Sequence, residues 1–215
     1  MNDEPVDLAI LGGTFDPVHV GHLRIARLVS DLLSARVCCV PSNIPPHKSS
    51  TVATPLQRLQ MLRLAVSADP RLCVDDLELE RGNRSYTLET LKIFRRRLGS
   101  SPRLYFVLGM DAYLNLPSWL GWRQLLDYAH LVVCRRETDQ TSAAGLLAFE
   151  RSHQVETTGM LKASAHGKLF FVDNAAVAVS STEIRKHLKT KCDPSAFLDP
   201  AVYAYILQEQ LYAAS

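Results

Sequence analysis

The segment that decides the fold of this chain is Leu11-Gly12-Gly13-Thr14-Phe15-Asp16-Pro17-Val18-His19-Val20-Gly21-His22. It follows an apolar run, Val6–Leu11, and leads into a segment with helical periodicity, Leu23–Leu33. A strand, a glycine turn and a helix in this order present backbone N–H groups and a helix N-terminus to an anion. We therefore predict an anion-binding turn between these two elements.

The residue types in the turn suit a phosphate. Gly12 and Gly13 can adopt backbone angles that a side chain forbids, and they let a ligand approach the main chain closely. Gly21 leaves space beside the start of the helix. His19 and His22 lie three residues apart, so they share a face if the helix has begun there. Two imidazoles beside the positive end of a helix suit a phosphate that gains negative charge during transfer.

The length of the motif makes it specific. A His-x-x-His pair is more often a surface or metal-binding feature, and a Gly-Gly turn after a strand is common. The full string with Phe15, Pro17 and Gly21 is much rarer, and it matches neither the G-x-G-x-x-G dinucleotide fingerprint nor the Walker loop G-x-x-x-x-G-K-[ST]. The string Gly13–His22 resembles the signature of nucleotidyltransferases, which join a nucleoside monophosphate to a small phosphorylated partner.

Composition sets limits on the class of protein. The chain has 215 residues, 47% hydrophobic and 21% charged, which is typical of a globular protein with a sizeable core. Its net charge of +2 is too small to argue for DNA, RNA or an anionic membrane as a partner. No run approaches membrane-spanning length, and the acidic first residues lack the basic region of a secretory leader.

The five cysteines are odd in number and show no C-x-x-C spacing. Three of them, Cys38, Cys39 and Cys134, fall in apolar, strand-like runs. This usage predicts buried thiols in a reducing compartment and argues against a disulfide framework or a zinc site. We expect a cytoplasmic protein.

Strand-like and helix-like segments alternate along the chain. The predicted strands are Val6–Leu11, Val37–Val40, Leu72–Val74, Arg103–Leu108, His130–Cys134, Lys168–Val172 and Ala176–Val179. The predicted helices are Leu23–Leu33, Pro55–Ala68, Leu88–Leu98 (closed by Gly99), Gly121–Tyr128, Leu146–His153, Ser181–Lys189 and Pro200–Leu211. This order predicts an α/β fold, a doubly wound, Rossmann-like parallel sheet with helices on both faces.

We expect one domain over residues 1–215. Residues 1–179 would form the parallel α/β core, and residues 180–215 a small helical part at the carboxyl edge of the sheet, where ligands bind in such folds. The signal fades between Glu137 and His166, where a helix inside a long loop is the best interpretation.

A second phosphate candidate is Ser180–Arg185, at the start of a predicted helix. Ser180 and Glu183 have the spacing of a capping box, which needs no ligand. The hydroxyls of Ser181 and Thr182, the free N–H groups and Arg185 also make an anion site. Both interpretations can hold at once. Ser-Ser-Thr-x-Ile-Arg also resembles the C-terminal motif with which the nucleotidyltransferases bind ATP phosphates, although Lys186-His187 follow where a further arginine is expected.

Basic residues elsewhere are weaker candidates. The segment Asn43–Lys48 places His47 and Lys48 after two prolines, and it is either a solvated loop or, by resemblance to a Pro-x-His-Lys loop, a clamp beside substrate phosphates. Arg58 is either a further phosphate contact or a charge on a helix surface. Arg135 is a candidate neighbour of adenine only through its position in the pattern.

Three further segments suit a base, a ribose or a carboxylate. N–H groups at Ser85-Tyr86-Thr87 could bind a carboxylate, although Ser85 or Thr87 could simply cap the helix. Asp111, after a strand that ends at Gly109, could bind a ribose hydroxyl or cap the next helix. The indole of Trp119 could stack on a pyridine ring, whereas Trp122 suits the core better.

The matching segments occur in the order of one family. They are Gly12–His22, Pro45–Lys48, Ser85–Thr87, Gly109–Asp111, Pro117–Trp119 and Ser181–Arg185. Together they resemble the bacterial nicotinate-nucleotide adenylyltransferases, which make nicotinate adenine dinucleotide and pyrophosphate from ATP and nicotinate mononucleotide during NAD biosynthesis.

The resemblance implies a set of site residues. It implies that His19, His22, Lys48 and Arg185 are catalytic. It implies that ATP contacts Gly12, Gly13, Thr14, Phe15, His19, His22, Gly109, Asp111, Ser181, Thr182 and Arg185. It implies that nicotinate mononucleotide contacts His47, Lys48, Tyr86, Thr87 and Trp119.

The expected chemistry is direct attack of the mononucleotide phosphate on the α-phosphorus of ATP, without a covalent enzyme intermediate. We expect Mg²⁺ to bind mainly through substrate phosphates, with no dedicated protein ligands. Two alternatives remain open: another small-molecule adenylyltransferase, using nicotinamide mononucleotide or phosphopantetheine, and a non-catalytic nucleotide sensor. The sequence also leaves open the oligomeric state, a homo-oligomer included, and how strictly nicotinate is preferred over nicotinamide.

Overall fold

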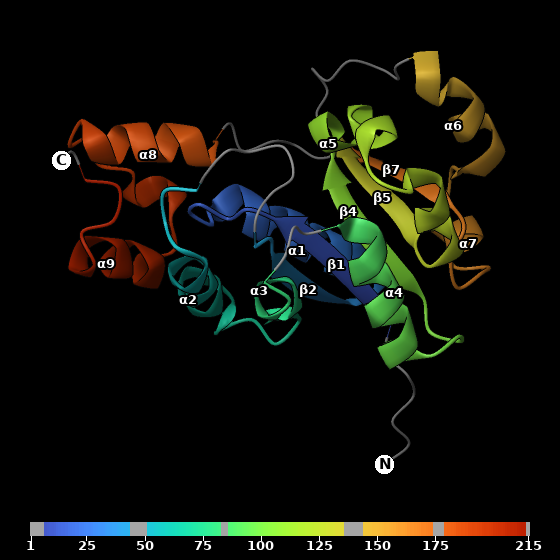
Figure 1. Ribbon diagram of the computed structural model, residues 1–215, viewed down its shortest axis with the longest axis horizontal. Coiled ribbons are helices and arrows are strands. Elements are labelled where there is room, and N and C mark those ends of the chain that lie inside the picture. The colour runs from blue at the N-terminus through green and yellow to red at the C-terminus, as the bar shows by residue number, and fades with distance from the viewer. Residues whose placement is uncertain (1–6, 44–50, 83–85, 136–143, 174–178, 214–215) are drawn as a thin grey trace. The chain divides into compact units, whose positions relative to one another are not determined.

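The computed structural model describes residues 7–43, 51–82, 86–135, 144–173 and 179–213 of the chain (Figure 1). These residues form an α/β fold with a seven-stranded sheet in the order β3-β2-β1-β4-β5-β7-β6. The strands are β1 (Leu8–Gly13), β2 (Arg36–Pro41), β3 (Leu72–Val74), β4 (Leu104–Gly109), β5 (His130–Arg135), β6 (Gln154–Val155) and β7 (Leu169–Asp173).

Helices separate most of these strands along the chain. The α-helices are α1 (Val20–Leu33), α2 (Pro55–Val66), α3 (Leu77–Glu80), α4 (Thr87–Leu98), α5 (Met110–Leu114), α6 (Leu147–His153), α7 (Thr158–Leu161), α8 (Ser181–Lys189) and α9 (Pro200–Gln208). The 3₁₀ segments are η1 (Leu116–Ser118), η2 (Trp122–Asp127), η3 (Ala144–Leu146) and η4 (Ser195–Phe197). The predicted Rossmann-like α/β class is therefore confirmed.

The strand pairs β1–β4, β4–β5, β5–β7 and β6–β7 all run parallel. One row of paired residues shows why near-continuous apolar runs form these strands. It consists of Leu11, Val107, Val132, Phe170 and Val155, all of them buried. Strands covered on both faces need apolar side chains in both directions, so their sequences do not alternate.

The chain divides into two compact units, which we describe separately. Unit 1 comprises Met1–Gly12, Val29–Val37 and Tyr86–Ala175, and unit 2 comprises Gly13–Leu28, Cys38–Ser85 and Ala176–Ser215. In unit 1, β4, β5 and β7 lie side by side, and α5 packs on β4 and β5 (Figure 1). In unit 2, α2 packs against both β3 and α9. The single-domain organisation stays a prediction.

Local signals account for several element boundaries. Thr54 and Gln57 form a capping box at α2, with Pro55 in the first turn, and Ser180 and Glu183 form the predicted box at α8. Gly99 ends α4 with a φ of 85°, a left-handed angle that a side chain disfavours. No helix among the described residues is long and apolar enough to cross a membrane.

Other predictions need correction. The predicted helix Gly121–Tyr128 is the 3₁₀ segment η2, and the acidic stretch before Arg81 contains the unpredicted helix α3. The predicted helix near Leu146–His153 is confirmed as α6, although β6 and α7 after it were not predicted. Of the predicted strand Ala176–Val179, only Val179 lies within the described residues, and it has no regular structure.

The prediction of buried thiols is confirmed for Cys38 and Cys39 in β2 and for Cys134 in β5. Cys73 in β3 is half-buried and Cys192 is exposed, and all five are free thiols.

Candidate functional site

The turn after β1 is held by hydrogen bonds to its backbone carbonyls, all of them within unit 2. Each donor lies far away along the chain, so the turn takes its shape from tertiary contacts. The bonds are Ser42 N–H to Gly13 O (2.9 Å), Arg58 Nη1 to Thr14 O (2.7 Å), Arg185 Nη1 to Asp16 O (2.6 Å) and Ser181 Oγ to Pro17 O (3.0 Å).

The hydrogen bonds to the carbonyls of the turn also fix the direction of the N–H groups that follow those carbonyls. In a trans peptide the C=O and the following N–H point in opposite directions. The carbonyls of Gly13, Thr14 and Pro17 point at their donors, so the N–H groups of Thr14, Phe15 and Val18 point away from them. Backbone N–H groups that point away from the donors of the protein can contribute to a concavity suited to an anion.

At Gly12 and Gly13 the absence of a side chain leaves space for neighbouring groups, and no positive φ is required. Neither Gly12 nor Gly13 has a positive φ, so neither uses the left-handed angles that are open to glycine. The left-handed residue of the turn is Phe15, with a φ of 51°. A Cβ on Gly13 would lie 2.9 Å from the Phe15 ring, so a side chain there would displace the ring. Phe15 itself is buried.

His19 and His22 face each other at the start of α1. Their ring centroids are 3.8 Å apart, and the His22 ring also meets Phe15 edge-on at 4.9 Å. The backbone N–H of His19 donates to Nδ1 of His22 at 3.3 Å. An Nδ1 that accepts a hydrogen bond carries no proton, so the His22 proton is on Nε2. His22 is therefore preset as a donor through Nε2.

His19 is buried and neutral. Burial lowers the pKa of His19 to about 4, and the negative charge of Glu183 opposes this shift only in part. Its Nδ1 has no hydrogen-bond partner among the described residues. A Cβ on Gly21 would lie 3.0 Å from this Nδ1 and 3.3 Å from Val179, which confirms the predicted need for space at Gly21.

This buried imidazole predicts a pH dependence of stability. Unfolded His19 has its ordinary pKa near 6.5, so between pH 6.5 and about 4 the unfolded state binds a proton that the folded state excludes. Its stabilisation is complete above pH 6.5 and falls as the pH is lowered. Between pH 7.5 and 5 the free energy of unfolding should fall by about 2 kcal/mol more in the wild type than in His19→Gln. Urea unfolding of both proteins at the two pH values measures this difference, and equal losses would contradict it.

The start of α8 supports both interpretations of the Ser180–Arg185 motif. Ser180 Oγ accepts from Glu183 N–H, and Glu183 Oε2 accepts from Ser180 N–H, so the capping box is present. Arg185 and Ser181 also reach the turn after β1 through the bonds given above. Arg185 Nη2 lies 3.3 Å from Thr182 Oγ1. The helix start and the glycine turn therefore form one site within unit 2.

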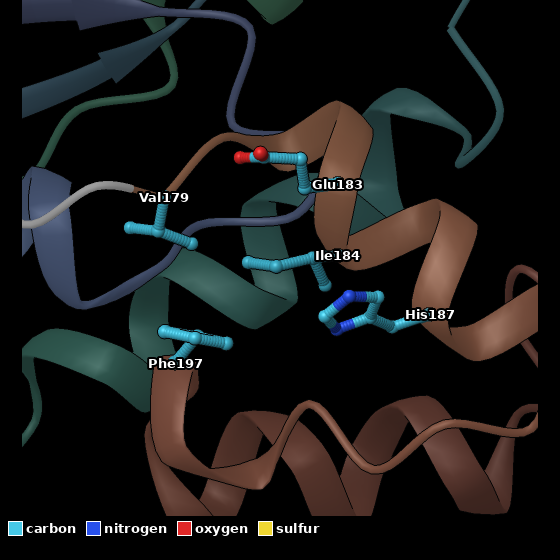
Figure 2. Close-up of a pocket in the computed structure, with 5 residues that line it drawn as sticks. All are labelled: Val179, Glu183, Ile184, His187 and Phe197. Carbon is cyan, nitrogen blue, oxygen red and sulfur yellow. The ribbon is translucent and has the colours of Figure 1, made fainter.

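Lys186 and His187 stand where a further arginine was expected. His187 lines a small pocket together with Val179, Glu183, Ile184 and Phe197 (Figure 2). The His187 ring lies 6.3 Å from that of Phe197, on the same side of α8 as buried Ile184. Lys186 is exposed.

Arg58 is not a charge on a helix surface, so that alternative is wrong, while a phosphate contact stays a prediction. Its side chain is fully buried in α2, and it donates to the carbonyls of Thr14 (2.7 Å) and Asn43 (3.1 Å). Burial lowers the pKa of Arg58, against the effect of nearby Asp16. It shapes the turn from within the protein.

Sequence reasoning missed two residues of this network. The buried Asp16 carboxylate accepts from the N–H groups of Val52 (2.9 Å) and Ala53 (3.1 Å) and from the Tyr212 hydroxyl (2.7 Å). Asp16 belongs to the recognised motif, and its acidic side chain between Phe15 and Pro17 was a signal. Nothing in the local sequence distinguished Tyr212.

Unit 1 contains the other predicted contacts. The Trp119 indole is half-buried and meets Phe106 edge-on at 6.2 Å, and a Cβ on Gly12 would lie 3.5 Å from the same Phe106 ring. Gly109 ends β4 and is the N-cap of α5, with exposed Asp111 in the first turn, so the alternative that Asp111 caps this helix is wrong.

Tyr86 and Thr87 begin α4 in unit 1. Tyr86 is the N-cap and no side-chain bond caps this helix, so the alternative of a Thr87 cap is wrong. Both side chains are half-buried. A Cβ on Gly121 would lie 2.6 Å from Leu88, so this helix start packs against the turn that follows Trp119. Trp122 is buried, as predicted.

Of the remaining candidates, only Arg135 lies within the described residues. Arg135, at the end of β5, pairs with Asp173 at 2.6 Å and lies over the Phe171 ring. His47, Lys48 and Ser85 lie outside the described residues. The described residues contain no group of three or more His, Cys, Asp or Glu side chains that could hold a metal ion.

Comparison with protein families and sequences gives consistent matches. Residues 10–187 match the cytidylyltransferase-like family model. The chain is 44% identical over 210 residues to a probable nicotinate-nucleotide adenylyltransferase of Aeromonas hydrophila, covering 95% of this chain and 96% of that protein. It is 38% identical over 209 residues to a protein of the same name from Marinomonas, covering 95% and 94%.

Comparison with solved structures supports the fold. Plasmodium falciparum nicotinic acid mononucleotide adenylyltransferase in complex with NaAD superposes with a TM-score of 0.73 at 20% identity, covering 96% of this chain and 97% of that one. A putative nicotinate-nucleotide adenylyltransferase from Vibrio parahaemolyticus superposes with a TM-score of 0.64 at 16% identity, covering 96% and 95%.

Proposed function

Because the chain belongs to the cytidylyltransferase-like family, we propose that it transfers the adenylyl group of ATP to nicotinate mononucleotide in NAD biosynthesis. The products are nicotinate adenine dinucleotide and pyrophosphate. The full-length relatives that bear this activity in their names are 36–44% identical to the chain, and a structural neighbour was solved with NaAD. Another neighbour was solved with APC.

The observation that carries the proposal is the arrangement around the turn after β1. His19 and His22 follow this turn directly, and Arg185 donates to the Asp16 carbonyl inside it at 2.6 Å. A triphosphate suits this turn, because its charge is spread over three phosphates. The imidazoles, the guanidinium and the directed N–H groups can each neutralise part of that charge.

The proposed reaction is a single in-line displacement. An oxygen of the mononucleotide 5′-phosphate forms a bond to the α-phosphorus of ATP, and the bond from that phosphorus to the α,β-bridging oxygen breaks. Pyrophosphate leaves with the electron pair. A phosphate ionised at neutral pH needs no general base, so catalysis is positioning and charge stabilisation.

We propose the following roles for residues of unit 2. His22 Nε2–H donates to oxygens around the α-phosphorus as negative charge moves to the leaving group. The Thr14 and Phe15 N–H groups, beside Gly12 and Gly13, bind the triphosphate, and neutral His19 contacts it from the same helix start. Ser181, Thr182 and Arg185 bind the pyrophosphate part. Lys48, from the segment outside the described residues, is proposed to contact substrate phosphates.

Unit 1 supplies the proposed contacts to the nucleosides. The Trp119 indole stacks on the pyridine ring, and Tyr86 and Thr87, at the start of α4, bind the nicotinate carboxylate through backbone N–H groups. Asp111, after Gly109, binds a ribose hydroxyl. His47 is proposed to contact the mononucleotide.

A divalent ion accompanies ATP in this proposal, and we propose Mg²⁺. The carboxylate of Asp16, within the turn, already accepts three hydrogen bonds. This suits an ion that binds through substrate phosphates and water. The ion neutralises phosphate charge, while the protein side chains orient the phosphates. The cytoplasmic location, the absence of nucleic acid partners and the oligomeric state stay predictions.

A pyrophosphate-release assay tests the function. With ATP and Mg²⁺, nicotinate mononucleotide should support release at a kcat/KM well above that of nicotinamide mononucleotide or phosphopantetheine. Higher kcat/KM with either of the other acceptors would identify a different adenylyltransferase. ATP binding without release with any acceptor would identify a nucleotide sensor.

A further inference from the structure

Tyr212 contacts the catalytic turn from the far end of unit 2. Its hydroxyl donates to Asp16 Oδ1 at 2.7 Å across 196 residues of sequence, and its side chain is 4% exposed. Its φ of 63° lies in the left-handed region, which is unfavourable for a non-glycine residue and persists only where surrounding contacts impose it. The structure therefore maintains this contact against a local preference.

Asp16 connects Tyr212 to the phosphate-binding groups. One carboxylate oxygen, Oδ1, accepts from Tyr212 and from Ala53 N–H. The other, Oδ2, accepts from Val52 N–H at 2.9 Å and lies 3.9 Å from Arg185 Nη1. Arg185 therefore lies beside a buried carboxylate without forming a close ion pair with it.

This distance has a consequence for phosphate binding. A guanidinium in a close, two-point pair with a carboxylate presents fewer donors to a substrate phosphate. Val52, Ala53 and Tyr212 donate three hydrogen bonds to the two oxygens of Asp16, so this carboxylate does not depend on Arg185 for a donor. Burial and the neighbouring carboxylate raise the pKa of Tyr212, so its hydroxyl keeps the proton that it donates.

We propose that Tyr212 is a positioning residue of the ATP phosphate site, whose hydroxyl holds the Asp16 carboxylate so that Arg185 stays available to the triphosphate. Without this hydroxyl, Oδ1 keeps only the Ala53 N–H, and the under-satisfied buried carboxylate pairs closely with Arg185. The inference rests on the proposed function for the identity of the bound phosphate.

The test is a double-mutant cycle of Tyr212→Phe and Asp16→Asn, with Tyr205→Phe on α9 as the matched control. Tyr212→Phe keeps the buried ring, so the fold should survive. We expect the KM for ATP to rise about tenfold, with kcat and the KM for nicotinate mononucleotide changed less than about threefold. In the Asp16→Asn background, where no negative charge attracts Arg185, Tyr212→Phe should change the KM for ATP less than twofold.

Calorimetric titration with ATP alone separates this inference from the proposed function. If wild-type protein releases no pyrophosphate with nicotinate mononucleotide, the proposed function fails, and a tenfold weaker Kd for ATP in Tyr212→Phe still supports the role of Tyr212. An unchanged KM and Kd for ATP, even with a lowered melting temperature, would overturn the inference. An equal effect of Tyr212→Phe in both backgrounds would overturn it too.

Discussion

The His22→Ala enzyme should lose about two to three orders of magnitude in kcat while retaining its fold and most of its affinity for ATP. The hydrogen bond from His19 N–H to Nδ1 leaves the proton of His22 on Nε2. The same hydrogen bond fixes the orientation of the His22 ring and so the direction of its Nε2–H. A donor fixed before the reaction stabilises charge that develops only in the transition state, so its loss affects kcat more than KM. Steady-state pyrophosphate release, with circular dichroism and thermal melting, measures both parts.

The matched control for this variant is Arg24→Ala. Arg24 lies on the exposed face of the same helix, α1, two residues further on. It should show nearly wild-type kcat and melting temperature. Retention of more than a third of wild-type kcat by His22→Ala would show that His22 is not the donor proposed.

The Arg185→Ala enzyme should lose about a hundredfold in kcat/KM for ATP. The guanidinium has two tasks in this structure, because it donates to the Asp16 carbonyl at 2.6 Å and lies where the leaving pyrophosphate is proposed to bind. Its removal weakens phosphate binding in the ground state and in the transition state, so KM should rise and kcat should fall. Arg185→Lys should recover only part of the loss, because lysine keeps the charge but not the planar pair of donors.

Lys189→Ala is the control for charge on α8, since Lys189 is exposed near the end of the same helix. It should change kcat/KM less than twofold. If Arg185→Ala stayed within threefold of the wild type, the guanidinium would have only the structural task.

Local sequence predicted the elements that carry their own signals. The helix α8 begins and ends at the predicted residues because Ser180 and Glu183 form a capping box on an amphipathic segment. The helix α3 was missed because four residues are too short to show helical periodicity. The segment η2 was predicted as an α-helix, and the i, i+3, i+4 spacing of Trp122, Leu125 and Leu126 suits one, whereas the chain forms 3₁₀ turns there.

Some site residues could be predicted from their near neighbours in the sequence, whereas others are placed by contacts with residues far along the chain. His19 and His22 were predictable because three residues separate them on one turn. Arg58 was not, because burial decides its role, and its partner Thr14 lies 44 residues away. The same holds for Tyr212, whose partner Asp16 is 196 residues distant. A pattern read over a short window contains no information about such pairs.

The carbonyl bonds of the first turn also bear on how the protein is made. Asp16 leaves the ribosome 169 residues before Arg185, which at about 5–20 residues per second is a delay of roughly 10–30 s. During this interval Ser42 and Arg58 are already available to hold the carbonyls of Gly13 and Thr14, whereas Ser181 and Arg185 are not yet made. The turn therefore receives its last two carbonyl donors only after the segment that forms α8 has been synthesised.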